Sequence, residues 1–299
     1  MSLLRHVRNL AIVSAFPVAM VAWHFPYATD DPLRREDAVR EFNEIGYAEP
    51  SAVTKDTEMN RQLVTVRERL GIRGQVRQFV EQYHLHDAAV LDVGSGRGYL
   101  QDIVTNYTGL DIAAVVAKHY HKRFVHGTAT AMPFADNTFD AAWSIWVLEH
   151  IPNPEAALSE IRRVVRPGGL LFLLPAWDCK PWAAQGYEAR PYRDLGLGGK
   201  LIKASIPIRN SEAYWIATAV PNRLLRGGFT GSGPTRLHYR RLEPNFSEYW
   251  QPDSDAVNDL DEMEVAMWFE SRGDTCLNCL PGRWRYLQRW EPLVIRLNK

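Results

Sequence analysis

The fold class follows from one segment, which reads Val90-Leu91-Asp92-Val93-Gly94-Ser95-Gly96-Arg97-Gly98-Tyr99-Leu100. An apolar run closes on an acid, a glycine turn follows, and the residues after the turn are compatible with the start of a helix. A strand–turn–helix unit of this kind presents backbone N–H groups and a helix N-terminus to an anionic ligand. The glycines follow a G-x-G-x-G spacing, whereas a dinucleotide site has G-x-G-x-x-G. The pattern therefore favours an anion smaller than a pyrophosphate.

A second strand-like segment supports a nucleoside-binding site. It runs from Asn106 to Leu110 and ends at Asp111, about twenty residues after Asp92. Such folds place at this point the acid that accepts hydrogen bonds from a ribose. The alternatives are structural: Asp92 as a turn-stabilising carboxylate, and Asp111 as a helix N-cap.

An ordered series of motifs continues along the chain. It comprises Gly127-Thr128-Ala129, Met132-Pro133-Phe134, Phe139 to Ser144, Trp146 to Ile151, a helix opened by Asn153-Pro154-Glu155, the turn Arg166-Pro167-Gly168-Gly169, and a strand from Leu170 to Leu174. Together with the glycine loop, this series resembles the class I S-adenosylmethionine-dependent methyltransferases, nearest to their small-molecule and quinone-type branch. The resemblance covers residues 85–177, about a third of the chain.

The resemblance implies that S-adenosyl-L-methionine is the cofactor. The family's glycine loop matches Asp92 to Gly98, and its ribose acid matches Asp111. The family often carries an acid where this chain has Thr128, so adenine would meet an uncharged oxygen here, or the backbone of Ala129. The predicted cofactor-binding residues are Asp92, Gly94, Ser95, Gly96, Gly98, Asp111, Ile112, Thr128, Ala129 and Trp146.

Methyl transfer from a sulfonium mainly requires donor and acceptor to be held close and in line. Trp146 is predicted to line the pocket, where an aromatic face attracts a cation, and Trp143 to lie in the core. His150 is the candidate general base, because its pKa can lie near neutrality, and it is needed only for a hydroxyl or an acidic carbon. The alternative for His150 is that it merely ends a strand loop.

The main hypothesis is a methyltransferase that acts on a small or lipid-like acceptor, and there are two alternatives. One is a catalytically weak, cofactor-binding scaffold module, which Thr128 and the uncertain base motivate. The other is a nicotinamide-dependent oxidoreductase, against which the glycine spacing argues.

Composition narrows the partners and the compartment. The formal net charge is zero, which argues against nucleic acid as a partner, because phosphate contacts require a basic footprint. Three cysteines indicate a reducing compartment rather than a disulfide framework. Cys276-x-x-Cys279 has the spacing of half a zinc site, but without a second pair it is interpreted as two loop thiols, and no metal is predicted.

The N-terminus is apolar. Arg5, His6 and Arg8 precede fourteen uncharged residues, 10–23, which is short for a membrane span. We expect residues 5–25 to contact the cytosolic face of a membrane. A buried N-terminal helix, or a cleaved signal or true span, are the alternatives.

The predicted fold is α/β: a Rossmann-like, doubly wound, mostly parallel seven-stranded sheet with a long insertion after strand five. The predicted divisions are an apolar segment (1–30), a helical cover (31–84), the cofactor-binding core (85–177), a substrate or lid insertion (178–280) and a C-terminal strand region (281–299). The insertion is split in charge, with eleven Lys or Arg against five acids in 178–246, and nine acids against one Arg in 247–275. Within it, residues 196–208 are expected to be a surface loop or a contact for a membrane or a lipid-like acceptor.

Overall fold

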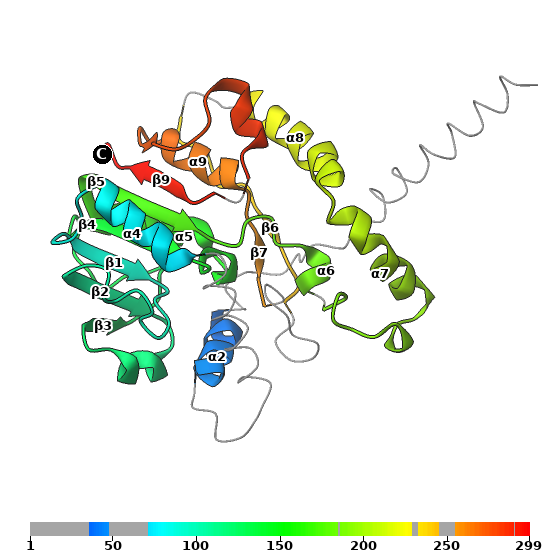
Figure 1. Ribbon diagram of the computed structural model, residues 1–299, viewed down its shortest axis with the longest axis horizontal. Coiled ribbons are helices and arrows are strands. Elements are labelled where there is room, and N and C mark those ends of the chain that lie inside the picture. Colours follow the sequence, from blue (N-terminus) through cyan, green and yellow to red (C-terminus); the bar gives the residue numbers. More distant parts are fainter. Residues whose placement is uncertain (1–35, 48–70, 185, 229–232, 245–254, 290) are drawn as a thin grey trace, which may run out of the picture.

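A computed structural model describes residues 36–47, 71–184, 186–228, 233–244, 255–289 and 291–299. Its centre is a seven-stranded sheet with the order β3-β2-β1-β4-β5-β9-β8 (Figure 1). The strands are β1 (Ala89–Val93), β2 (Asn106–Asp111), β3 (Arg123–His126), β4 (Phe139–Ile145), β5 (Val165–Leu174), β8 (Thr275–Cys276) and β9 (Leu293–Arg296). The prediction of a mostly parallel seven-stranded sheet is confirmed.

The strand directions place the loops that carry the sequence motifs at one edge of the sheet. β1, β2, β3, β4 and β5 are parallel, whereas β9 runs antiparallel between β5 and β8. The last strand of the chain therefore lies inside the sheet and not at its edge. Because parallel strands end at one edge, the loops that follow β1, β2, β4 and β5 gather there, as ligand-binding loops do in open α/β sheets.

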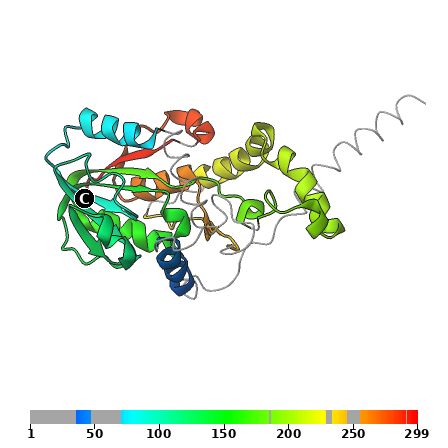
Figure 2. The same cartoon turned by 60° about the horizontal axis from the view of Figure 1, so that its bottom comes forward.

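Helices cover both faces of the sheet (Figures 1 and 2). On one face, α5 (Pro154–Val164) and α9 (Glu262–Glu270) pack on residues such as Leu91 and Leu171. On the other, α4 (Ile72–Gln82) packs on residues such as Val90 and Phe172. Neighbouring residues of a strand thus point into different cores, as strand alternation requires.

Helix α5 forms as the sequence predicts. The Asn153 side chain accepts the N–H of Ala156, and Pro154 occupies the first turn. Ala157, Leu158 and Ile161 are buried on one face. The helix ends at Val164, before the Pro-Gly-Gly turn at which its end was expected. Strand β5 begins at Val165 and includes that turn, where its pairing register with β4 shifts.

The glycine loop is not followed by a helix, which corrects the sequence-based expectation. Residues 97–102 form consecutive turns, with hydrogen bonds such as that from the N–H of Gln101 to the carbonyl of Gly98. Gly98 has φ of +70°, a left-handed conformation that a right-handed helix does not contain. A helix dipole therefore contributes nothing at this loop.

The insertion after β5 is mainly helical. Its first helices extend away from the sheet (Figures 1 and 2), whereas its last helix, α9, packs on the sheet. Its described elements are α6 (Pro181–Ala184), η4 (Tyr192–Asp194), α7 (Leu197–Arg209), α8 (Glu212–Gly228), the short pair β6 (Arg240–Arg241) and β7 (Asn258–Asp259), and α9. Residues 197–208 form a helix, so the expectation of a surface loop there was wrong.

Ion pairs join the basic half of the insertion (178–246) to its acidic half (247–275). Arg223 on α8 lies 2.8 Å from Asp261, and Arg226 lies 2.7 Å from Glu264 on α9. The basic half therefore binds the acidic half and is not simply a solvated surface.

Cys276 and Cys279 form a disulfide, with 5.6 Å between their Cα atoms, so their interpretation as two loop thiols was wrong. The loop after β8 turns back towards β9 and brings the sulfurs together, as a Cα separation in this range allows. Cys179 is free and buried. The disulfide also weakens the argument from cysteine content for a reducing compartment.

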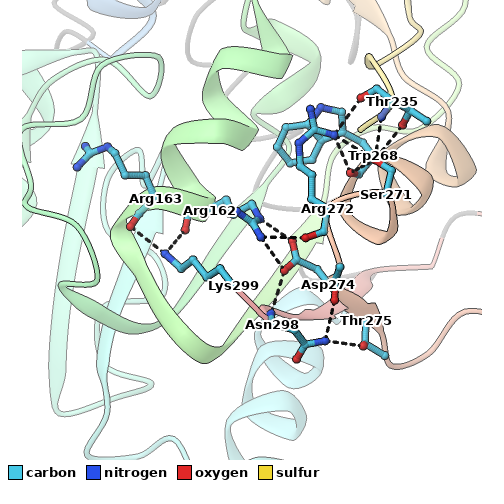
Figure 3. A network of polar contacts seen from close by, with 11 residues as sticks. Arg162, Arg163, Thr235, Trp268, Ser271, Arg272, Asp274, Thr275, Asn298 and Lys299 are labelled. Atoms are coloured by element: carbon cyan, nitrogen blue, oxygen red, sulfur yellow. Dashed lines mark hydrogen bonds and ion pairs between the residues drawn. The ribbon is translucent and has the colours of Figure 1, made fainter. Parts of the chain in front are cut away.

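A polar network holds the residues that follow β9 (Figure 3). Arg162 of α5 donates to both carboxylate oxygens of Asp274, at 2.7 and 3.2 Å. Asp274 also accepts the N–H of Asn298, and the ammonium of Lys299 donates to the carbonyls of Arg162 and Arg163. This network joins α5 to the segment that follows β9.

The N-terminal expectations are tested only in part. Within residues 31–84, the described parts contain helix α2 (Glu36–Tyr47) and helix α4. Residues 1–35 and 48–70, with the predicted membrane contact, lie outside the described residues. Among the residues that are described, no helix is long and apolar enough to cross a membrane.

Candidate active site

The glycine loop is fastened to the end of β2 by its own backbone. The N–H groups of Gly94 and Ser95 donate to the carbonyl of Leu110, at 2.8 and 3.0 Å, and the N–H of Gly98 donates to the carbonyl of Ser95. The N–H of Gly96 donates to Asp111 Oδ2 at 2.7 Å. These four N–H groups, which the sequence suggested for an anion, are therefore engaged within the protein.

Asp111 joins the glycine loop to the loop after β2. Its Oδ1 accepts the N–H of Ala113 at 2.9 Å, while Oδ2 holds Gly96. Burial raises the pKa of Asp111, the N–H groups of Ala113 and Gly96 oppose that rise, and the charge of Glu44 adds to it. Because an ionised carboxylate offers about four acceptor positions, Asp111 retains acceptor capacity for hydroxyl donors such as those of a ribose.

Glu44 brings α2 to the same edge of the sheet. Its carboxylate accepts the N–H of Ala114 at 2.6 Å and that of Val115 at 3.3 Å, both in η2 (Ala114–His119). These contacts dock α2 against the loop that follows β2. No sequence motif singled out Glu44, because its contact spans about 70 residues of sequence.

Two tyrosines to which the sequence analysis gave no role form hydrogen bonds that hold Asp92 and the glycine loop in place. Tyr107 donates its hydroxyl to Asp92 Oδ2 at 2.7 Å. The hydroxyl of Tyr120 lies 2.7 Å from Ser95 Oγ and 2.8 Å from the carbonyl of Gly96. Burial is the largest cause of the raised pKa of both tyrosines, so both remain protonated donors at neutral pH.

Two glycines are required by close approach. Gly94 has φ of +72°, and a Cβ there would lie 2.3 Å from a methyl carbon of Val147. A Cβ at Gly109 would lie 2.7 Å from Ser95 Oγ and from the ring of Tyr120. Gly109 had no assigned role in the sequence, yet its missing side chain lets Tyr120 reach the glycine loop.

The predicted adenine loop lies next to Asp111. The N–H of Gly127 donates to the carbonyl of Asp111 at 3.0 Å. Thr128 Oγ1 lies 2.9 Å from Thr130 Oγ1 and accepts the N–H of Thr130 at 3.3 Å. The Thr128 hydroxyl thus shapes its own turn, and Thr128 and Ala129 are both only partly buried. Ile112, also partly buried, follows Asp111 directly.

The end of β4 carries backbone strain. Trp146 is a non-glycine residue with φ of +56°, and such residues cluster at functional sites. It is partly buried, whereas Trp143 is fully buried, which confirms the prediction for Trp143. Ser144, which pairs with Val93 in the sheet, is buried, and its hydroxyl has no hydrogen-bond partner among the described residues.

His150 lies between two carboxylates. It ends η3 (Leu148–His150), with Nε2 3.7 Å from Glu149 Oε1 and Nδ1 3.4 Å from Asp255 Oδ2. The insertion binds this turn, because the N–H of Val257 donates to the carbonyl of Glu149. His150 retains 24% of its side-chain exposure, so solvent or a ligand can reach it.

Together, these loops suit a nucleoside carrying an amino-acid tail. The glycine loop leaves backbone without side chains, Asp111 offers acceptor positions, and buried Ser144 offers an unused hydroxyl. Hydrogen bonds join Asp111 to the loop 94–98, and the neighbouring Asp92 is held by Tyr107. Nothing observed links Thr128 or Ala129 directly to the glycine loop.

Comparisons with known proteins agree with this arrangement. Residues 91–173 match the family described as methyltransferase domain. A sterol 24-C-methyltransferase of Gibberella zeae is 35% identical over 27% of this chain and 26% of its own. A demethylmenaquinone methyltransferase of Renibacterium salmoninarum is 39% identical over 28% of this chain and 39% of its own. A fatty-acid O-methyltransferase of Mycolicibacterium smegmatis is 29% identical over 54% of this chain and 65% of its own.

One solved structure resembles nearly the whole chain. It is Burkholderia thailandensis 1,6-didemethyltoxoflavin-N1-methyltransferase, with a TM-score of 0.51 and 14% identity over 92% of this chain and 94% of that chain. At this identity the likeness concerns the fold.

The strand order, the antiparallel β9 and the matched segment 91–173 define the class: this chain carries a class I S-adenosylmethionine-dependent methyltransferase domain. The chain spans only 26% to 65% of the length of the three relatives above. Within the class, its acceptor is a matter of proposal.

Proposed function

We propose that this protein transfers a methyl group from S-adenosylmethionine to a small or lipid-like acceptor. The observation that carries the proposal is the bonded unit of Gly96, Asp111 and Ala113 at the carboxyl edge of the sheet. S-adenosylmethionine supplies an electrophilic methyl group on a sulfonium. The protein's own task is to bind, orient and exclude water, which is the main source of rate in such a displacement.

The geometry supports the following cofactor roles. Asp111 accepts the ribose hydroxyls, and Ile112, Thr128 and Ala129 border the adenine. Asp92, held by Tyr107, meets the amino group of the tail. The loop Gly94, Ser95, Gly96 and Gly98 faces the tail with little side chain, and Trp146 lies towards the sulfonium.

His150 is the proposed base for an acceptor that must lose a proton. Asp255 and Glu149 lie on either side of its ring, and a neighbouring carboxylate stabilises the imidazolium that forms when His150 takes a proton. An acceptor that needs no deprotonation would make His150 dispensable.

The lipid-like nature of the acceptor is supported by the surface of α7 and α8. Both helices expose large apolar side chains, namely Leu197, Leu201, Ile208, Ile216, Leu224 and Leu225. Exposed apolar groups of this extent mark binding surfaces. The relatives named for sterols, quinones and fatty acids are consistent with an apolar acceptor. We extend the proposal to work at the cytosolic face of a membrane, with residues 5–25 as a second contact.

The enzymatic proposal is tested by incubating the protein with S-adenosylmethionine and three acceptor types: a demethylated quinone, a fatty acid and a sterol. Formation of S-adenosylhomocysteine that depends on one acceptor supports it, and Asp111→Asn should reduce that rate. Binding of S-adenosylmethionine without turnover on any acceptor would favour the scaffold alternative. Binding of NAD without S-adenosylmethionine would favour the oxidoreductase.

Membrane proximity needs a separate measurement. The full chain and a variant with Leu197, Leu201 and Ile208 changed to Ser are sedimented with vesicles that contain anionic lipid. We expect the full chain to sediment with the vesicles and the variant to do so less. Equal partition of both into the supernatant would reject the membrane contact.

A further inference from the structure

The disulfide Cys276–Cys279 lies apart from the methyl-transfer residues, at the outer side of the sheet. Cys276 ends β8, the edge strand, which pairs with β9. Strands β4, β5 and β9 lie between β8 and β1, the strand that leads into the glycine loop. Nothing in the proposed methyl transfer uses this pair of sulfurs.

A small hollow adjoins the disulfide. It is narrow and partly open, and Cys279, Glu262, Arg285 and Gln288 line it together with apolar residues. One of the two sulfur residues therefore shares a cavity with a carboxyl group.

Glu262 is the unusual member of this set. It is only 2% exposed. Its Oε1 accepts the Gln288 side-chain amide at 2.6 Å, but its Oε2 accepts no hydrogen bond of ordinary length within the described residues. Burial of a charged carboxylate costs more than burial of the neutral acid, which favours the protonated acid.

Gln288 connects Glu262 to the disulfide loop. Its Oε1 accepts the N–H of Leu280 at 2.7 Å, and its Nε2 donates to Glu262. Leu280 directly follows Cys279. A two-step hydrogen-bond path thus runs from the residue beside the sulfur to the buried acid.

The charges around Glu262 come from three elements. Burial raises its pKa to about 7, with a further rise from Asp261. Gln288, Arg223 of α8 and the main chain of Glu291 lower the pKa. Arg285 of η5 (Gly282–Leu287) also lines the hollow, and its guanidinium binds Glu270 at 2.8 Å. Glu262 can therefore both give and take a proton near neutral pH.

We propose that Cys276–Cys279 is a thiol–disulfide exchange site for a dithiol reductant, with Glu262 as the group that gives a proton to Cys279 and takes it back. The reductant's thiolate attacks Cys276 Sγ and forms a mixed disulfide. The S–S bond breaks, and its electron pair goes to Cys279 Sγ, which takes the proton of Glu262. The reductant's second thiol, after losing its proton to solvent, attacks the mixed disulfide. Cys276 leaves as a thiolate and takes a proton from solvent, while the reductant becomes a disulfide.

Exchange at this site reaches the insertion through η5. Arg223 of α8 donates to the carbonyls of Tyr286 and Gln288 at 3.1 and 2.6 Å. The loop closed by the disulfide leads directly into this segment. Reduction therefore frees the loop on which the docking of α8 depends.

The test compares the full chain with Glu262→Gln. Both are reduced by dithiothreitol at pH about 6 and about 8, quenched with acid and a maleimide, and the peptide with Cys276 and Cys279 is followed by mass spectrometry. The ratio of the two rates cancels the titration of the reductant itself. General acids contribute about 10²-fold or more, so we expect the variant to be at least tenfold slower at pH 6 and nearly equal at pH 8.

Further variants test whether the carboxyl group of Glu262 causes the rate difference. Glu262→Asp should restore part of the difference, and Asp136→Asn, which removes an exposed carboxylate that pairs with Arg163, should behave as the unchanged protein. If Glu262→Gln does not fold, the unchanged protein alone decides: its rate per reductant thiolate should fall as pH rises through about 7. A pH-independent ratio, a flat profile in the unchanged protein, or free thiols at both cysteines after treatment with oxidised dithiothreitol would overturn the proposal.

Discussion

The backbone N–H of Gly96 donates to the carboxylate of Asp111 over 2.7 Å, so the residue proposed for the ribose also fixes the loop proposed for the amino-acid tail. Both ends of the cofactor site therefore depend on one side chain. Asp111 is buried and accepts a second N–H from Ala113. A change at Asp111 should affect the loop as well as the ligand.

We expect Asp111→Asn to weaken S-adenosylhomocysteine binding by about tenfold to a hundredfold, because a hydrogen bond to a charged group contributes about 1.5–3 kcal/mol. The Asn side chain also has an NH₂ group, which cannot accept one of the two backbone N–H groups. Titration calorimetry measures the affinity. Asp102→Asn is the matched control, since Asp102 is exposed and pairs with His121. Equal affinity of both variants would contradict the role of Asp111.

Tyr120→Phe tests the support of the glycine loop. The change removes the hydroxyl that bonds Ser95 and Gly96 and keeps the ring. At about 1 kcal/mol for each hydrogen bond, we expect cofactor affinity to fall by about threefold to thirtyfold. Tyr192→Phe in the exposed η4 is the control. If thermal stability falls while affinity is unchanged, Tyr120 supports the fold only.

Gly94→Ala separates backbone strain from a steric clash. A left-handed backbone costs an alanine about 1–2 kcal/mol, and at Gly94 the new Cβ also meets Val147. Gly168 has φ of +76° with open space around it, so Gly168→Ala measures the backbone cost alone. We expect Gly94→Ala to lose clearly more stability in urea unfolding than Gly168→Ala. Equal losses would mean that Val147 moves aside freely.

The sequence predicted those parts of the fold that depend on short-range patterns. The strand before Gly94, the strand ending at Asp111 and the cap at Asn153 each have a local signature, and all three are present. The helix expected after Gly98 is absent, because the left-handed backbone at Gly98 breaks it.

Contacts between residues far apart in the chain could not be predicted from the sequence. The pairs Tyr107–Asp92 and Glu44–Ala114 depend on register and on helix docking, which no motif encodes. The cysteine pair was misread for a related reason. Its spacing suits a metal or a disulfide, and only the turn between β8 and β9 brings the sulfurs together.

Asp274→Ala should destabilise the fold without changing the cofactor site. The carboxylate of Asp274 is buried and holds Arg162 and the N–H of Asn298 (Figure 3). Breaking a buried pair by removing one partner costs about 3–5 kcal/mol. Asp136→Ala removes a comparable but exposed pair with Arg163, for which about 0–1 kcal/mol is expected. Urea unfolding measures both. A large loss of cofactor affinity with little loss of stability would contradict this structural role.

Glu262 should make stability depend on pH. Its pKa is about 7 in the folded protein against an ordinary value of 4.5, so folding favours the protonated acid. The resulting stability is fully present below pH about 4.5 and is lost as pH rises through about 7, at up to roughly 1.4 kcal/mol for each pH unit. Glu262→Gln stays neutral, so its stability should fall less than that of the unchanged protein between pH 5 and pH 8. Urea unfolding of the oxidised proteins at both pH values measures the difference, with Asp136→Asn as control. Parallel pH dependence in all three proteins would show that Glu262 is already ionised at pH 5.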